Sequence, residues 1–300
     1  MALHHIQTPV LSIACQVVGP EDGTPVILLH GFPYSVHAYA EVAPRLAAAG
    51  CRVYGPHLRG YGETRFLAAD TMRSGEQAAI GHDTLDLMDA LKIKSAVLAG
   101  FDWGGRGAAV VAALWPERVS GLVSCAGYPI QDIAAAGAPI DPAQEYRYWY
   151  QHYFQTERGR RGLAVHRIEL TRLLWKLWSP TWGFDEAILK RTTDHFDNTD
   201  FVDVVIHSYR HRMGNAPGEP RYAAVEAKLA VQPKIRVPTI VIHGAVDDVG
   251  PAALSELHQR YFTGPYERRV FANVGHNPPQ ESPREFADAV LALCGKRSQK

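Results

Sequence analysis

The 300-residue sequence has no excess of charge of either sign, because Lys and Arg together number 31 and so do Asp and Glu. Without a net field the chain has no general attraction to nucleic acid or to a membrane, and we expect neither as a partner. It has only four cysteines, Cys15, Cys51, Cys125 and Cys294, and none forms a CxxC pair. This scatter is typical of reduced core thiols rather than of a disulfide framework.

Long apolar runs and targeting signals are also missing. No stretch approaches the ~20 apolar residues that span a bilayer, and the N-terminal segment lacks the basic start and apolar centre of a signal peptide. We therefore expect a cytoplasmic protein. A hydrophobic content of 46% with 21% charged residues fits a globular chain with a sizeable core.

Short apolar runs alternate with helix-forming segments along much of the chain. This alternation favours an α/β fold with a doubly wound, mostly parallel sheet flanked by helices. A possible capping box, Ser74 with Gln77, marks the start of one helix. The predicted strands are 8–18, 26–30, 51–56, 95–99, 119–126, 238–243 and 268–272, and the predicted helices are 39–49, 75–91, 106–115 and 283–293.

Residues 131–233 break this alternation. They contain no convincing buried strand, yet four of the six tryptophans fall among them. We interpret the segment as a helical cap, or lid, inserted into a core domain that comprises residues 1–130 and 234–300.

The sequence Gly-Phe-Asp-Trp-Gly-Gly at 100–105 separates a predicted buried strand from a helix. This is the layout of a nucleophile elbow, with Asp102 where serine is usual. Taken alone, Asp102 could equally be a helix N-cap. The glycine frame favours the nucleophile, because a tight turn exposes the side chain at a helix N-terminus that stabilises a carboxylate. Such a carboxylate can displace a leaving group from saturated carbon, and the resulting ester must then be hydrolysed.

Ester hydrolysis needs a base, an acid that orients it, and an oxyanion hole. Among 14 histidines, His276 follows the last predicted strand in a Gly-His loop. Asp247 and Asp248 follow the preceding strand, and we favour Asp247 as the orienting acid and Asp248 as a solvated loop residue. The backbone N–H groups of Phe32 and Trp103 are the natural oxyanion donors, although the turn before Phe32 could be a tight loop only.

Three segments together resemble the aspartate-nucleophile branch of the α/β-hydrolase superfamily, which includes epoxide hydrolases and haloalkane dehalogenases. They are His30-Gly31-Phe32-Pro33, the elbow at 100–105 and Gly275-His276. The resemblance extends from about Val26 to Leu293. It implies an α/β-hydrolase fold with eight strands and a helical cap, and it implies neither a cofactor nor a metal.

Two tyrosines of the predicted cap favour epoxide opening. The segment 148–155 resembles the Tyr-Gln-x-Tyr-Phe-Gln segment of epoxide hydrolases, which maps the first donor to Tyr150, and 207–210 maps the second to Tyr209. A phenol with a pKa near 10 can protonate an alkoxide-like oxygen. Cap aromatics usually only pack, so it is the matching neighbours that favour these roles.

The resemblance also implies a small-molecule substrate, which we expect to be an apolar epoxide, and a homodimer is compatible with the sequence. The residues expected to contact substrate are His30, Pro33, Trp149, Tyr153 and Arg106.

Carbon–halogen cleavage is the alternative reaction. Haloalkane dehalogenases typically carry asparagine where Phe32 stands, whereas haloacetate dehalogenases share His-Gly-Phe-Pro and an Asp-Arg-Gly-Gly-Arg elbow whose arginines hold a carboxylate. Here the first of those arginines is Trp103, and only Arg106 matches the second. We favour an ion pair of Arg106 with a core carboxylate over binding of an acidic substrate. A non-catalytic, ligand-binding member of the superfamily is a third possibility, which the intact set of nucleophile, acid and histidine disfavours.

Overall fold

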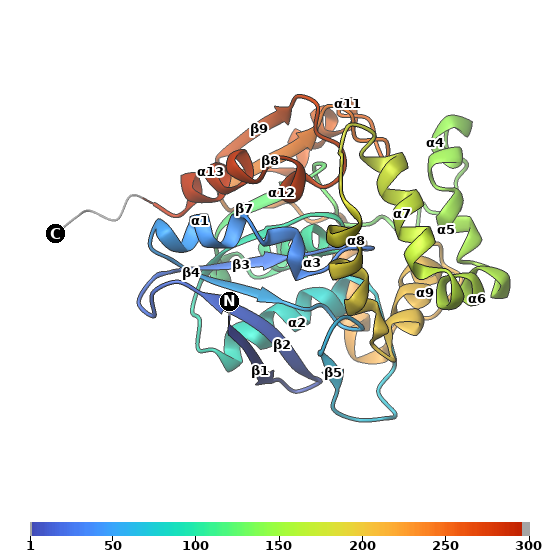
Figure 1. Ribbon diagram of the computed structural model, residues 1–300, viewed down its shortest axis with the longest axis horizontal. Helices are drawn as coiled ribbons and strands as arrows, with labels where there is room; N and C mark the ends of the chain where they lie inside the picture. The colour runs from blue at the N-terminus through green and yellow to red at the C-terminus, as the bar shows by residue number, and fades with distance from the viewer. Residues whose placement is uncertain (1, 296–300) are drawn as a thin grey trace.

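The computed structural model describes residues 2–295, which form a nine-stranded sheet flanked by helices (Figure 1). The strand order is β1-β2-β4-β3-β6-β7-β8-β9, with the short β5 paired to β2. Strands β3, β4, β6, β7, β8 and β9 run parallel, whereas β1, β2 and β5 pair antiparallel. Their bounds are β1 Ala2–Gln7, β2 Leu11–Val18, β3 Thr24–Leu29, β4 Cys51–Pro56, β5 Arg65–Phe66, β6 Ala96–Gly100, β7 Val119–Cys125, β8 Thr239–Gly244 and β9 Tyr266–Phe271.

The central parallel strands are mostly buried, which is why they read as continuous apolar runs. Every residue of β6 and β8 is buried. Helix α1 packs with α13 and α2 packs with α3, so the sheet is covered by helices, as the alternation predicted. The helices outside the cap region are α1 Val42–Ala48, α2 Gln77–Ala90, α3 Asp102–Leu114, α11 Ala253–Glu256, α12 Pro278–Glu281 and α13 Pro283–Leu293.

The sheet differs from the expectation at its first edge. The expected opening strand at 8–18 is realised as β2, and it is preceded by β1, whose residues are mostly exposed. Because β1 lies at the edge and pairs with one strand only, it carries no buried apolar pattern that a sequence would reveal. With β5 as well, the sheet has one strand more than the eight expected.

Two helix starts were also predicted wrongly. The helix expected from residue 39 begins only at Val42, after a separate 3-10 turn that ends at Tyr39. The capping box at Ser74 does not form. The Ser74 hydroxyl donates to Glu76 Oε1 over 2.7 Å, and α2 starts at Gln77 without a side-chain cap.

Between β7 and β8 the described residues form helices and turns without a strand, and α4 to α9 gather along one side of the sheet (Figure 1). We call residues 131–233 the cap segment; its division from the core as a domain stays a prediction. None of the described helices is long and apolar enough to span a membrane. The cap helices are α4 Pro142–Arg147, α5 Trp149–Tyr153, α6 Glu157–Val165, α7 Arg167–Trp178, α8 Glu186–Thr193, α9 Phe201–Arg212 and α10 Ala223–Leu229.

The turn from β6 into α3 is tightly constrained. Asp102 has a φ of +50°, a left-handed conformation that aspartate tolerates better than most residues. A Cβ atom on Gly104 would lie 2.0 Å from the carbonyl oxygen of Leu29 in β3, and one on Gly31 would lie 2.5 Å from Asp102 Oδ1. The helix can therefore approach the neighbouring strand only because these positions are glycine.

We expect Gly104→Ala to destabilise the protein by roughly 3 kcal/mol or more, because backbone rather than a movable side chain opposes the added methyl group. Thermal and urea unfolding would measure the loss. The matched control is Gly137→Ala, since a Cβ there would meet nothing within 4 Å. Equal stability of the two variants would contradict this account of the elbow.

Candidate active site

Asp102 is held at the elbow with one oxygen already engaged. The Phe32 N–H donates to its Oδ1 over 2.7 Å. Burial alone would raise the pKa of this carboxyl, but His276, Arg106 and the Phe32 N–H together hold it below its ordinary value. Asp102 is thus an anion at neutral pH, and Oδ2 is the oxygen without this bond.

His276 stands between two carboxylates. Its Nδ1 lies 3.0 Å from Asp247 Oδ2, and its Nε2 lies 3.8 Å from Asp102 Oδ2, an ion-pair distance that is too long for a hydrogen bond. Burial would lower the pKa of His276, but Asp247 and Asp102 raise it to about 10. The imidazole is therefore protonated while Asp102 is charged.

The two adjacent aspartates have different surroundings. Asp247 is buried beside His276 and also accepts a hydrogen bond from the Val249 N–H over 2.9 Å. Asp248 is half-exposed and forms an ion pair with Arg147 of α4 at 2.9 Å. The structure therefore brings Asp247, and not Asp248, to the histidine.

The two expected oxyanion donors flank Asp102. Phe32 N–H already points at the carboxylate, and Trp103 is the second residue of α3, where an amide N–H has no acceptor within the helix. The Trp103 indole is buried and stacks on Phe32, with ring centroids 5.8 Å apart. The catalytic assignments of both groups stay predictions.

The two cap tyrosines meet above this loop. Tyr150 in α5 and Tyr209 in α9 are buried, and their ring centroids lie 5.5 Å apart. The ring of Tyr209 also packs 5.4 Å from that of Phe32. Gln151 Nε2 donates to the Tyr150 hydroxyl over 3.2 Å, while the Tyr209 hydroxyl has no hydrogen-bond partner among residues 2–295. Burial, with a contribution from Asp102, raises the pKa of both phenols, so both keep their protons.

A cavity of about 200 Å³ opens beside Asp102. Four of the predicted site residues line it, namely Asp102, Arg106, Asp247 and His276. The other lining residues are Cys125, Ala126, Pro129, Tyr148, Ile242, Gly244, Val249 and Pro278.

His30 and Pro33 lie outside the lining of this cavity and have structural contacts instead. The Leu58 N–H donates to His30 Nε2 over 3.2 Å, so Nδ1 carries the proton and donates to Gly31 O. Burial lowers the pKa of His30 to about 3, which keeps it neutral. The carbonyl of Pro33 accepts a hydrogen bond from Trp175 Nε1.

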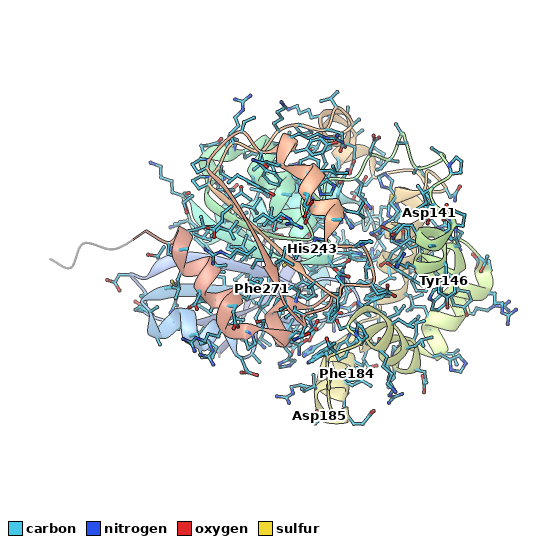
Figure 2. All side chains as sticks on the ribbon, turned by 90° about the horizontal axis from the view of Figure 1, so that it is seen from above. Asp141, Tyr146, Phe184, Asp185, His243 and Phe271 are labelled. Carbon is cyan, nitrogen blue, oxygen red and sulfur yellow. The ribbon has the colours of Figure 1, made fainter. Side chains whose placement is uncertain are left out.

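Trp149 and Tyr153 also lie outside this lining. They are half-buried on α5 and pack against each other, with ring centroids 6.2 Å apart. The helix that carries them is broken at Tyr148, so Tyr146 belongs to α4 and is 78% exposed. Figure 2 shows Tyr146 toward one edge of the molecule and His243 nearer its middle.

The sequence did not reveal the residues that fix the histidine loop. Ser179, after α7, accepts a hydrogen bond from the His276 N–H over 3.0 Å and donates to Glu281 Oε1 over 2.7 Å. The other oxygen of Glu281 accepts from the Gly275 N–H. Trp178 packs edge-on against the His276 ring at 5.1 Å. Only the position of Glu281, five residues after the histidine, could have drawn attention to this network.

One group elsewhere has metal-ligand character. Atoms of Glu76, His211 and Glu226 lie within 4.8 Å of one another. Both oxygens of Glu226 already accept hydrogen bonds, from Gln77 Nε2 and from the Ala78 N–H. The three residues are not part of the cavity lining.

The fold and this site together define a class of protein. Residues 24–283 match the family model described as alpha/beta hydrolase fold, and the chain belongs to that family. Within it, the chain is similar to epoxide hydrolases. A solved structure of an epoxide hydrolase candidate from Klebsiella pneumoniae subsp. pneumoniae superimposes with a TM-score of 0.95, at 46% identity over 97% of each chain.

Curated relatives point the same way. Epoxide hydrolase A of Mycobacterium tuberculosis is 26% identical over 90% of each chain. Epoxide hydrolase B of the same species is 31% identical over 46% of this chain, a match that spans only 42% of the relative. These likenesses identify an epoxide hydrolase-like member of the family.

We expect Asp247→Asn to lower the pKa of His276 from about 10, because the protonated imidazole loses the carboxylate that contributes most to stabilising its charge. An NMR titration of the imidazole signals would measure this. Asp248→Asn is the matched control and should leave the titration unchanged. The same lowering in both variants would show that the two aspartates act alike.

Proposed function

We propose that this protein hydrolyses an epoxide to a vicinal diol through an ester on Asp102. The observation that carries this is the ionised Asp102 facing the His276–Asp247 pair. The protonated Tyr150 and Tyr209 pack against each other, and Tyr209 also packs against Phe32, whose N–H holds Asp102. The similarity to epoxide hydrolases supports the choice of substrate class.

In the first step Oδ2 of Asp102 attacks an epoxide carbon. Oδ1 is held by the Phe32 N–H, so it becomes the carbonyl oxygen of the ester. The carbon–oxygen bond of the ring breaks, and its electron pair takes a proton from Tyr209 or Tyr150, which becomes a tyrosinate. The buried hydroxyl of Tyr209, without another partner among the described residues, suits such a donor.

Ester formation changes the charge of the site in favour of the second step. The carboxylate of Asp102 is neutralised, so one of the two charges that raise the pKa of His276 is lost. The imidazolium then releases its proton, which restores the tyrosinate to a phenol. Neutral His276 can now accept a proton from water.

That water attacks the ester carbonyl carbon of Asp102. The negative charge that forms on Oδ1 is stabilised by the N–H groups of Phe32 and Trp103. Collapse of the intermediate breaks the bond to the alkyl oxygen, which takes a proton from His276 and leaves as the diol. The Asp102 carboxyl retains the second proton of the water and passes it to His276, which restores the resting carboxylate and imidazolium. The sum is one epoxide and one water converted to one diol.

A single turnover in ¹⁸O-water should place the label in Asp102 and not in the first diol, because the water oxygen adds to the carboxyl carbon. Mass spectrometry of the peptide containing Asp102 and of the diol would measure both. A parallel reaction in unlabelled water is the control. Label in the first diol would mean direct attack by water on the epoxide and would remove the ester mechanism.

Dehalogenation through the same ester is the alternative, and one observation favours it. The indole Nε1 of Trp103 is buried without a hydrogen-bond acceptor among residues 2–295. It is therefore a donor that could stabilise a departing halide. A halide leaves as an anion and needs no proton, so the tyrosines separate the two reactions.

The variant with both Tyr150→Phe and Tyr209→Phe should lose roughly 100-fold or more in the rate of ester formation from an epoxide, because the alkoxide has no acid. Ester formation from a matched haloalkane, measured by halide release, should not fall in this way. Tyr146→Phe, at an exposed position, is the control. Unchanged epoxide opening in the double variant would show that the tyrosine assignment is wrong, and halide release without epoxide opening in the unaltered protein would favour the alternative.

A further inference from the structure

Arg106 does not have the carboxylate partner that the sequence suggested. It lies in α3, one turn after Asp102, and is 9% exposed. Its Nε donates to the carbonyl of Pro129 over 3.3 Å, and no carboxylate of residues 2–295 lies within ion-pair distance. The side chain instead lines the cavity together with Asp102 and His276.

A second guanidinium approaches the same region from the cap. Arg212, the last residue of α9, stacks its guanidinium carbon 4.4 Å from the ring centre of Tyr209. Its Nη1 makes one long contact of 3.5 Å with Gln151 Oε1. The Nε and Nη2 groups are buried and have no acceptor among the residues that the structure describes.

Arg59 is a buried arginine that, unlike Arg106 and Arg212, has a carboxylate partner. Nε and Nη2 of Arg59 each lie 2.7 Å from an oxygen of Asp83, in a bidentate ion pair. Buried donors left without acceptors cost free energy. Arg106 and Arg212 have no such carboxylate among residues 2–295, so a contribution to stability alone does not explain their burial.

Among the residues that line the cavity, Asp102 and Asp247 supply carboxyl groups, and Arg106 and His276 supply basic groups. The guanidinium of Arg212 approaches from the cap, where it lies on the ring of Tyr209. Burial, together with repulsion from Arg212, lowers the pKa of Arg106 to about 10, so it remains charged at neutral pH. A planar carboxylate that enters the cavity would match the paired N–H groups of the Arg106 guanidinium.

We propose that the substrate carries a carboxylate, which Arg106 binds directly and Arg212 stabilises from the cap, so that the substrate class is an epoxide of a carboxylic acid. The epoxide part rests on the function proposed above, whereas the anion site stands on the arginines alone. The cavity of about 200 Å³ suits a short acid. This replaces the expectation of an apolar epoxide.

Binding is tested first, with a pair of unreactive ligands that differ only in charge, but-2-enoate and but-2-enamide. Calorimetry on the unaltered protein should show the carboxylate bound roughly tenfold or more tightly than the amide. Arg106→Gln should abolish this preference and Arg212→Gln should reduce it. Arg172→Gln is the matched control, because Arg172 is exposed and pairs with Glu186. Equal affinity for both ligands in the unaltered protein would overturn the proposal.

Turnover is tested with the corresponding epoxides, 2,3-epoxybutanoate and 2,3-epoxybutanamide. The ratio of their kcat/KM values should favour the acid by roughly tenfold or more and fall toward one in Arg106→Gln. Similar turnover of both epoxides would refute the anion site and leave the proposed function intact. Preferential binding of but-2-enoate without turnover of either epoxide would support the anion site and refute the proposed function. If Arg106→Gln fails to fold, the unaltered protein and Arg212→Gln still decide the matter.

Discussion

The close approach of the loop after β3 to the turn between β6 and α3 is the contact on which the site depends. It requires glycine at 31 and 104, a left-handed backbone at Asp102, and parallel pairing of β3 with β6. A left-handed aspartate costs roughly 1 kcal/mol, and the packed strands and helix offset that cost. In return the Phe32 N–H reaches Asp102 Oδ1. Asp102 and the Phe32 N–H, the proposed nucleophile and oxyanion donor, are therefore positioned by the same constraint, and neither can move without the other.

The electrostatics of the site are arranged around a charge that changes during the proposed reaction. Asp102 is anionic in the resting state and helps to keep His276 protonated, so the histidine is not yet a base. Esterification removes that charge and so makes the base available only when there is an ester to hydrolyse. The raised pKa values of Tyr150 and Tyr209 have the opposite consequence, because they keep both phenols as proton donors for the first step. The same burial makes each phenol a weaker acid and disfavours the tyrosinate that this step forms, so the tyrosinate readily takes a proton back from His276.

Local sequence patterns predicted the parts of the site that backbone geometry dictates. The glycines around Asp102 and the Gly-His loop at His276 identify a tight turn whatever surrounds them. Contacts between residues far apart in the sequence left no local pattern from which they could be predicted. Ser179 reaches the histidine loop over almost a hundred positions of sequence, and the partner of a single arginine cannot be read from its neighbours. The break at Tyr148 leaves no local signal either, since Tyr146, Tyr150 and Tyr153 keep a helical spacing across it although the helix does not continue.

The packing of the cap segment on the core affects the solvation of Arg106 and Arg212, two arginines without a carboxylate partner among the described residues. Phe32, Trp103, Phe154 and Tyr209 pack their rings against one another where cap and core meet, and all four are buried. Burial beside such a cluster removes solvent that would otherwise stabilise a guanidinium. Arg106 is 9% exposed, and Nε and Nη2 of Arg212 are buried. Because electrostatic interactions are stronger where water is excluded, a substrate with its own negative charge would gain more over a neutral one at these arginines than at surface charges.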